Sequence, residues 1–357
     1  MQNATVGVAL RGHPSPDVTL GWPQRATPTN FPASARVFVA VTILCVLAAA
    51  AFASWLPLQV SIVTVFLFAG PHNWFELRYF LMRLPVRFGR SRSFFLTAFT
   101  GLGVLTVTYI SLPFLYNATL WSEEAWYLVL ASWNTALLFW LALLVWLRSR
   151  QKRGANWKWT IPVALALCSL NWLGPDLFSL AIVYVHPLIA LWFLDRHIRR
   201  TRPAWSRAYR RCLWLLPLVL IAMIWQLSQT APLPDNNGLF WRITQHSGAE
   251  VLPQISSYML VSVHLFLEML HYGVWIVALP LIGRMASARF LEVKTIPIAR
   301  HPKGFPRIVA GLLVFAVVAV AGLWFGFSID YSTTRDIYFT VAIAHVLAEA
   351  PFLLRML

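Results

Sequence analysis

Long apolar runs recur from one end of the chain to the other, and they constrain the fold more than any other feature. A helix of about 18 or more predominantly apolar residues can cross the hydrocarbon core of a bilayer. No segment between the runs is long enough for a soluble domain of ordinary size. Of the 357 residues, 59% are hydrophobic and only 12% are charged, a balance typical of polytopic membrane proteins. We therefore expect an all-α helical bundle that crosses the membrane many times.

The apolar pattern predicts about ten transmembrane helices. They are residues 37–57, 60–82, 94–115, 125–147, 159–173, 177–196, 212–229, 256–282, 308–327 and 337–354. The fifth is short, and a turn at "GPD", residues 174–176, separates it from the sixth. We expect residues 1–35, which are rich in Pro, Thr and Gly, to form a mobile cytoplasmic tail, and residues 36–357 to form a single transmembrane domain.

The connections between these helices alternate between basic and non-basic. The basic ones are 83–92, 148–158, 196–211 and 284–307; the others, 116–124, 174–176, 230–255 and 328–336, hold only Arg242 and Arg335 as cations. Because cytoplasmic loops carry an excess of Lys and Arg, this alternation predicts ten spans with both termini in the cytoplasm. The formal charge of +16 is thus a topology signal and does not indicate nucleic acid as a partner. We expect a multi-pass protein of the bacterial inner membrane.

Ionisable side chains inside the spans form a pattern. Five of the nine histidines lie there, and the three acids that lie deep in spans each follow a histidine by four residues. The pairs are His72/Glu76 in "HNWFE", His264/Glu268 in "HLFLE" and His345/Glu349 in "HVLAE"; the other two histidines are His186 and His271. A separation of four places two side chains on one face of a helix. Each pair can therefore point at one site.

The depth of these residues supports a shared site. All histidine-bearing spans are even-numbered, so they run from outside to inside in the predicted topology. His186, His264 and His345 lie about nine or ten residues from the outer end of their spans and His72 about thirteen, which is near the middle of the bilayer at 1.5 Å per residue. Ionisable groups at this depth each cost a few kcal/mol, so eight of them predict a common function. Three prolines that would bend these helices lie beside the polar pairs: Pro71, Pro187 and Pro351.

Imidazole and carboxylate together suit iron, manganese or zinc. The expected metal ligands are His72, His186, His264, His271, His345, Glu76, Glu268 and Glu349. The three glutamates are candidates for direct ligands, for catalytic groups, or for acceptors that orient the imidazoles. One metal ion and two are both consistent with the pattern, and iron is the metal we expect. His264 and His271 are about 10 Å apart along the helix axis, which favours two ions or an outer role for one histidine.

Three further polar residues have structural explanations. Asn134 and Asn171 are expected to form hydrogen bonds between helices. Arg78 is expected at the cytoplasmic end of its helix, where its side chain could reach towards water or bind a carboxylate or a lipid phosphate; we favour the first.

The stretch "GPHNWFE" resembles the microbial membrane β-carotene dioxygenases, the Brp/Blh family, whose early helix carries a Pro-His-Gly-x-x-Asp pattern. Pro71, His72 and Glu76 occupy similar positions here, with Asn73 for Gly and Glu for Asp. The resemblance implies a non-haem iron held by intramembrane histidines and oxidative cleavage of a polyene within the bilayer. The H-x-x-x-H and H-x-x-H-H boxes of membrane desaturases and hydroxylases are absent.

These observations favour an integral-membrane metalloenzyme, a non-haem iron oxygenase or oxidase that acts on a lipophilic substrate such as a carotenoid, an isoprenoid or a lipid. A haem- or pigment-binding electron-transfer subunit would also explain histidines within the membrane. A proton or metal-ion transporter with a His/Glu relay is the third alternative. The expected partners are lipids, the lipophilic substrate and a redox protein.

Overall fold

A computed structural model describes residues 35–86, 88–119, 122–151, 157–234, 238–283, 292–302 and 304–356. All regular secondary structure in this part of the chain is helical, which confirms the all-α fold class. The predicted tail, residues 1–35, lies outside the described residues except for Ala35.

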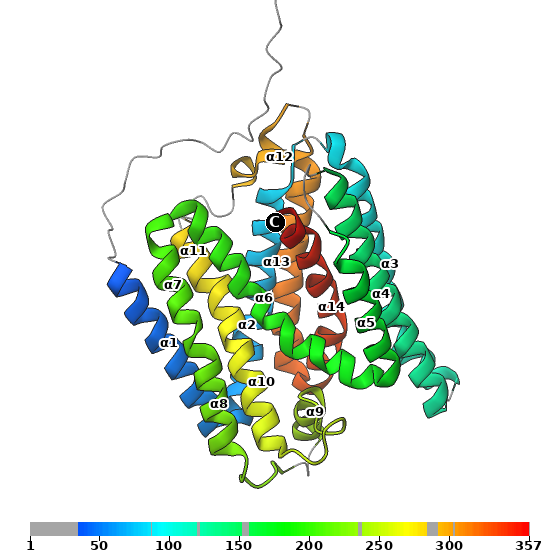
Figure 1. Ribbon diagram of the computed structural model, residues 1–357, viewed down its shortest axis with the longest axis vertical. Helices are drawn as coiled ribbons and strands as arrows, with labels where there is room; N and C mark the ends of the chain where they lie inside the picture. Colours follow the sequence, from blue (N-terminus) through cyan, green and yellow to red (C-terminus); the bar gives the residue numbers. More distant parts are fainter. Residues whose placement is uncertain are drawn as a thin grey trace, which may run out of the picture.

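The long helices lie side by side in one bundle (Figure 1). They are α1 (Ala35–Trp55), α2 (Pro57–Arg83), α3 (Arg92–Thr119), α4 (Glu123–Gln151), α5 (Thr160–Leu173), α6 (Pro175–Thr201), α8 (Leu215–Leu227), α10 (Ser257–Tyr272), α13 (Pro306–Ile329) and α14 (Tyr331–Met356). Shorter helices flank them: α7 (Ser206–Leu213), α9 (Gly238–His246), α11 (Leu279–Ile282) and α12 (Pro297–Arg300). Each of the ten predicted spans coincides with a helix.

Eight helical stretches in the described residues are long and apolar enough to cross a membrane. They are Ala35–Trp55, Gly89–Leu115, Glu123–Gln151, Pro175–Thr201, Pro203–Leu227, Ser257–Ile282, Pro306–Ile329 and Tyr331–Met356. Of the other two predicted spans, α2 has 27 residues but carries His72, Glu76 and Arg78, whereas α5 is apolar but has only 14 residues. At 1.5 Å per residue α5 is about 21 Å long, shorter than a hydrocarbon core. The fold is that of a multi-pass integral membrane protein.

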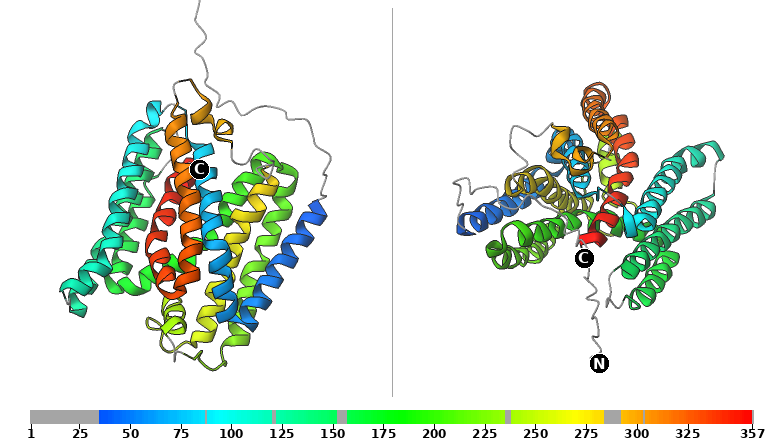
Figure 2. Two further views of the ribbon diagram at one scale, coloured as in Figure 1. Left: turned by 180° about the vertical axis from the view of Figure 1, so that it is seen from behind. Right: turned by 90° about the horizontal axis from the view of Figure 1, so that it is seen from above.

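Four helices form the centre of the bundle: α2 and α6 each contact both α10 and α14. Around them, α13 packs on α2 and α14, α1 and α8 pack on α10, and α3 and α4 pack on α14. Seen from above, α3, α4 and α5 lie on one side of the molecule and α1 and α8 on the other (Figure 2). The central helices are therefore shielded from lipid on several sides, which is where polar groups in a membrane protein are expected.

The two predicted interhelical amides are confirmed as such. Asn134 on α4 donates to the carbonyl of Pro175, 3.3 Å away, and to Ser179 Oγ, 3.1 Å away, both on α6. Asn171 on α5 donates to the carbonyl of Ala131 on α4 at 2.8 Å. Both asparagines are fully buried, so they join α4, α5 and α6 rather than contribute to a site.

The expectation for Arg78 is wrong. Its side chain is only 3% exposed, and Nη2 donates to Thr295 Oγ1 at 3.0 Å. Segment 292–302, including α12, packs against α2 and covers this end of the helix. The guanidinium is thus buried by protein instead of reaching into water.

Candidate metal centre

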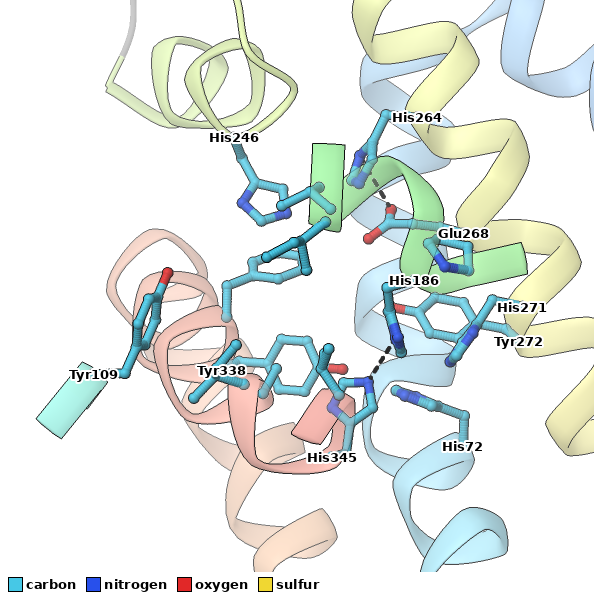
Figure 3. A pocket seen from close by; sticks show the side chains of 17 residues that line it. His72, Tyr109, His186, His246, His264, Glu268, His271, Tyr272, Tyr338 and His345 are labelled. Atoms are coloured by element: carbon cyan, nitrogen blue, oxygen red, sulfur yellow. Dashed lines mark hydrogen bonds and ion pairs between the residues drawn. The ribbon is translucent and has the colours of Figure 1, made fainter. Parts of the chain in front are cut away.

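Each of the four central helices brings one histidine to a common point. His72 comes from α2, His186 from α6, His271 from α10 and His345 from α14, and we call them the four-histidine cluster (Figure 3). Ring centroids are 5.3 Å apart for His72 and His271, 5.2 Å for His72 and His345, 4.7 Å for His186 and His271, and 5.0 Å for His186 and His345. Residues up to 273 positions apart in the sequence therefore share one site.

The helices are irregular where these histidines lie. Pro71 is inside α2 directly before His72, and Pro187 is inside α6 directly after His186. Directly after α10, a π-helical segment, Gly273–Ala278, begins two residues after His271. π-helical turns are rare and occur frequently at functional sites, because they re-aim the side chains around them. Three of the four ligand-bearing helices thus depart from regular α-helical hydrogen bonding at the cluster.

Two of the imidazoles have one ring nitrogen held by an acceptor. Nδ1 of His72 lies 3.1 Å from the carbonyl oxygen of Phe68, and Nδ1 of His186 lies 3.1 Å from Oε2 of Glu349. An acceptor at Nδ1 places the hydrogen there and leaves the lone pair on Nε2. Metal-binding histidines are commonly oriented by a carbonyl or carboxylate in this way.

The Nε2 atoms of His186 and His345 lie at a distance suited to binding one ion. Nε2 of His186 lies 3.1 Å from Nε2 of His345. Two nitrogens that each lie about 2.1 Å from one ion, at an angle of about 90–110°, are about 3.0–3.4 Å apart. The pair can therefore be a hydrogen bond in the metal-free protein and become two neighbouring ligands when an ion binds.

The donor atoms fall into three groups, and within each group they all lie within 4.8 Å of one another. The first comprises His72, Glu76, His271 and His345; the second comprises His186, His271 and Glu349; the third comprises His246, His264 and Glu268. The first two share His271 and form an inner site. All eight residues expected from the sequence belong to one of the three groups, but His264 and Glu268 are in the outer one.

Buried donor atoms in the inner site lack hydrogen-bond partners among the described residues. They include Nε2 of His72, both oxygens of Glu76 and both ring nitrogens of His271. His72 is 0% exposed and Glu76 is 1% exposed. Burying polar atoms without partners is costly, so such a concentration points to a missing ligand. Imidazole nitrogens with one or two carboxylates are a donor set that fits a transition-metal ion.

The outer group contains His246, which sequence reasoning missed. It ends the short helix α9, and its ring lies 5.2 Å from that of His264. Burial, followed by the nearby Arg335 guanidinium, lowers the pKa of His246 well below its ordinary value, so the ring is neutral. Its place in a loop between two spans gave no periodicity from which this position could be inferred.

His264 and His271 thus have different surroundings, as their separation along the helix required. His264 Nδ1 lies 3.9 Å from Glu268 Oε2 in the outer group, whereas His271 is at the centre of the inner site. Of the eight expected ligands, His271 rather than His264 lies with His72, His186 and His345. Both histidines still line the same cavity.

An aromatic layer lies under the inner site. It consists of Tyr79, Phe80, Phe193, Trp275 and Phe352, which we call the aromatic floor. Each follows a cluster histidine on its own helix by four to eight residues, so the layer lies one or two turns nearer the predicted cytoplasmic side. Phe80 and Phe352 are stacked at 4.3 Å, and Trp275 contacts Tyr79 at 5.5 Å and Phe193 at 5.4 Å. This layer closes the site on that side.

The chain matches no protein-family model, and it has no significant match among curated proteins or solved structures. What the site can do therefore follows from its own groups. These are four converging imidazoles, two buried carboxylates beside them and a cavity that leads away from them towards α9.

Proposed function

We propose that the protein is an integral-membrane metalloenzyme, a non-haem iron oxygenase that acts on a lipophilic substrate. The observation that carries this proposal is the orientation of the cluster. Nδ1 of His72 and Nδ1 of His186 each lie 3.1 Å from an oxygen, of the Phe68 carbonyl and of Glu349 respectively, which leaves Nε2 of each ring available to bind an ion. The short sequence resemblance to the membrane β-carotene dioxygenases agrees with such a centre.

In this proposal the inner site holds one iron ion. His72, His186, His271 and His345 are its ligands, and Glu76, one oxygen of which lies in the first donor group, is a further ligand. Glu349 orients His186 through the contact of 3.1 Å to Nδ1. Iron bound here would supply the activation of dioxygen.

The outer group is less suited to a second cation. Arg335 is buried and acts electrostatically on His246, His264 and Glu268. A guanidinium so close to three donor atoms opposes the binding of another positive ion. We therefore assign Glu268 to acid–base chemistry on substrate in the cavity, where it lies beside His264.

The cavity suits an apolar substrate. Beyond the histidines, its walls include Tyr109, Ile182, Ile343 and Val346. The aromatic floor keeps cytoplasmic water from the site, which protects reactive intermediates. Cleavage of a carbon–carbon double bond by one dioxygen molecule gives two carbonyl groups and needs no external electrons. Hydroxylation would need two electrons, and hence the redox partner expected from the sequence.

The two alternative functions fit the geometry less well. Axial histidines on a haem approach iron from opposite faces at about 2 Å each, with the porphyrin plane between them. The Nε2 atoms of His186 and His345 lie 3.1 Å apart, so these two histidines are not placed as such a pair. A His/Glu relay through the membrane needs a chain of polar groups on both sides of the site, whereas the packed rings of the aromatic floor separate it from Arg83 and His197, the next polar groups on the predicted cytoplasmic side.

We also propose ten membrane crossings with both termini in the cytoplasm of a bacterial cell. The eight long apolar stretches would be joined by α2, whose polar side chains face the centre of the bundle, and by α5, which pairs with α4 through Asn171. Reporter enzymes fused after residues 120, 175, 235 and 330 test this topology, because their activity depends on the side of the membrane on which they lie. Each fusion should report the outer side.

The functional test uses protein purified in detergent and loaded anaerobically with Fe(II). Dioxygen uptake is followed on adding lipophilic substrates with conjugated or isolated double bonds, for the wild type and for His345→Ala. His301→Ala, a histidine in the connection before α13, is the matched control. Substrate-dependent uptake should occur in the wild type and the control and disappear in His345→Ala. Iron-loaded protein that consumes no dioxygen with any such substrate would refute an oxygenase.

A further inference from the structure

A second cavity adjoins the one that contains the four-histidine cluster. The two share Tyr109, His246 and Phe339, whose side chains lie at the boundary between them. The second cavity is additionally lined by Trp241, Arg242, Gln245, Arg335, Asp336 and Thr340, from α9 and the outer end of α14. In Figure 3, Tyr109 and His246 lie at the far side of the pocket from His72 and His345. The pair of cavities thus runs from the metal centre to the outer end of the bundle.

Arg335 is the unusual residue in the outer cavity. Its side chain is 3% exposed, yet it takes part in none of the ion pairs that the described residues form. Nη1 donates to the carbonyl of Arg242 at 3.3 Å, and the guanidinium lies 4.6 Å above the ring of Phe339. Nε has no hydrogen-bond partner among the described residues. A buried guanidinium normally has a carboxylate or another anion as its partner.

The carboxylates nearby do not fulfil this role. Asp336 is engaged by Arg242, with which it forms an ion pair at the mouth of the cavity. Glu268 acts on Arg335 electrostatically, but its one ion-pair contact is with His264. Arg335 therefore lines a cavity with a positive charge that no described carboxylate pairs with, in surroundings where an anion would be strongly favoured.

Between Arg335 and the cluster one side of the cavity wall is apolar, while His246, His264 and Glu268 lie on another. Phe339, Ala342, Ile343 and Val346 follow one another along α14 towards the cytoplasmic side, with Ile182 and Val183 of α6 opposite. Arg335 and His345 are ten residues apart on one helix, which is about 15 Å along its axis. A cavity with a cation at one end, an apolar wall and metal donors at the other matches an amphiphile with one anionic end.

We propose that Arg335 binds the anionic head group, a carboxylate or a phosphate, of a long-chain amphiphile whose acyl or isoprenoid chain extends to the metal centre. The substrate is then an anionic lipid, and the carbon that reacts lies about 15 Å from the head group. The claim that the chain reacts at the metal centre rests on the proposed function. Binding of the head group does not, because it needs no metal.

The experiment measures binding of a fluorescent conjugated fatty acid to metal-free protein in detergent, for the wild type and two variants. Arg335→Gln should weaken binding by about tenfold or more, whereas Arg335→Lys, which keeps the charge, should weaken it less. Arg207→Gln, which removes an exposed arginine of the segment between α6 and α8, is the matched control and should bind as the wild type does. The methyl ester of the same acid should bind the wild type as weakly as the acid binds Arg335→Gln.

Competition with further probes identifies the head group and the chain length. A long-chain alkyl phosphate that displaces the fluorescent acid better than an unlabelled fatty acid identifies phosphate; the reverse order identifies carboxylate. Butyrate and inorganic phosphate, which lack the chain, should not displace it. Equal affinity of the wild type for acid and methyl ester would overturn the proposal even if Arg335→Gln failed to fold. If the wild type binds the head group through Arg335 but binds no metal ion, the inference about Arg335 stands and the proposed function is refuted.

Discussion

Replacing Glu349 by glutamine tests how the carboxylates serve the metal centre. Glu349 is 0% exposed, and Oε2 lies 3.1 Å from Nδ1 of His186. Glutamine keeps the size of the side chain and one oxygen acceptor but removes the charge. A hydrogen bond that involves a charged group is worth about 1.5–3 kcal/mol. Loss of a carboxylate that orients a metal-bound imidazole typically weakens metal affinity by about 10–100-fold, or about 1.4–2.7 kcal/mol, in agreement with that range.

The assay is anaerobic competition for Fe(II) between the purified apoprotein and a coloured chelator. Glu349→Gln should bind Fe(II) about 10–100-fold more weakly than the wild type. Glu123→Gln, an exposed glutamate at the start of α4, should leave the affinity unchanged. Affinity within twofold of the wild type would show that Glu349 does not orient His186. Complete loss of Fe(II) binding in a folded variant would make Glu349 a direct ligand instead.

Three further outcomes follow from the packing, the charges and the donor set. Gly101→Ala would place a Cβ in steric conflict with Nε1 of Trp140, so we expect a loss of about 1–3 kcal/mol, seen as a lower thermal midpoint in detergent. Gly103→Ala, with nothing within 4 Å of its Cβ, should lack this effect. Hydrogen bonds from the Thr333 side chain, then from its backbone, lower the pKa of Asp330, which caps α14. The charged Asp330 carboxylate therefore stabilises the folded protein in full above the ordinary carboxyl pKa, and this stabilisation is lost as the pH falls through the lowered pKa. Asp330→Asn should remove that acid-dependent part of the thermal midpoint. Removing the metal with a chelator should lower the midpoint of the wild type, since an ion present at 100 times its Kd stabilises by about 2.7 kcal/mol; an unchanged midpoint would indicate that no metal was bound.

The helical bundle could be predicted from the sequence because membrane spans are encoded locally. Apolar length and the alternation of basic loops located ten helices, including α2, whose polar residues take it outside a simple hydropathy criterion. The H-x-x-x-E pairs also placed their residues on inward faces, since a spacing of four is a property of one helix.

The grouping of the donors could not be predicted, because it depends on how the helices are staggered. Depth counted along each span placed His264 level with His186 and His345. The structure instead brings His271, about two turns further along the same helix, to that level. Pro71, directly before His72, also alters the local rise and direction of α2, which a residue count does not capture. The position of His246 could not be predicted from the sequence for another reason: a short helix in a loop that folds back onto the bundle has no periodic hydrophobic pattern.

The metal content of the purified protein decides whether the four-histidine cluster is a metal centre. Protein produced with ample iron should contain about one transition-metal ion per chain by mass spectrometry, without a haem absorption band. His271→Ala, which removes the imidazole shared by both inner donor groups, should lose that ion, whereas His301→Ala should keep it. A folded wild-type protein without a transition metal, or a His271→Ala variant that retains it, would contradict the assignment of this site.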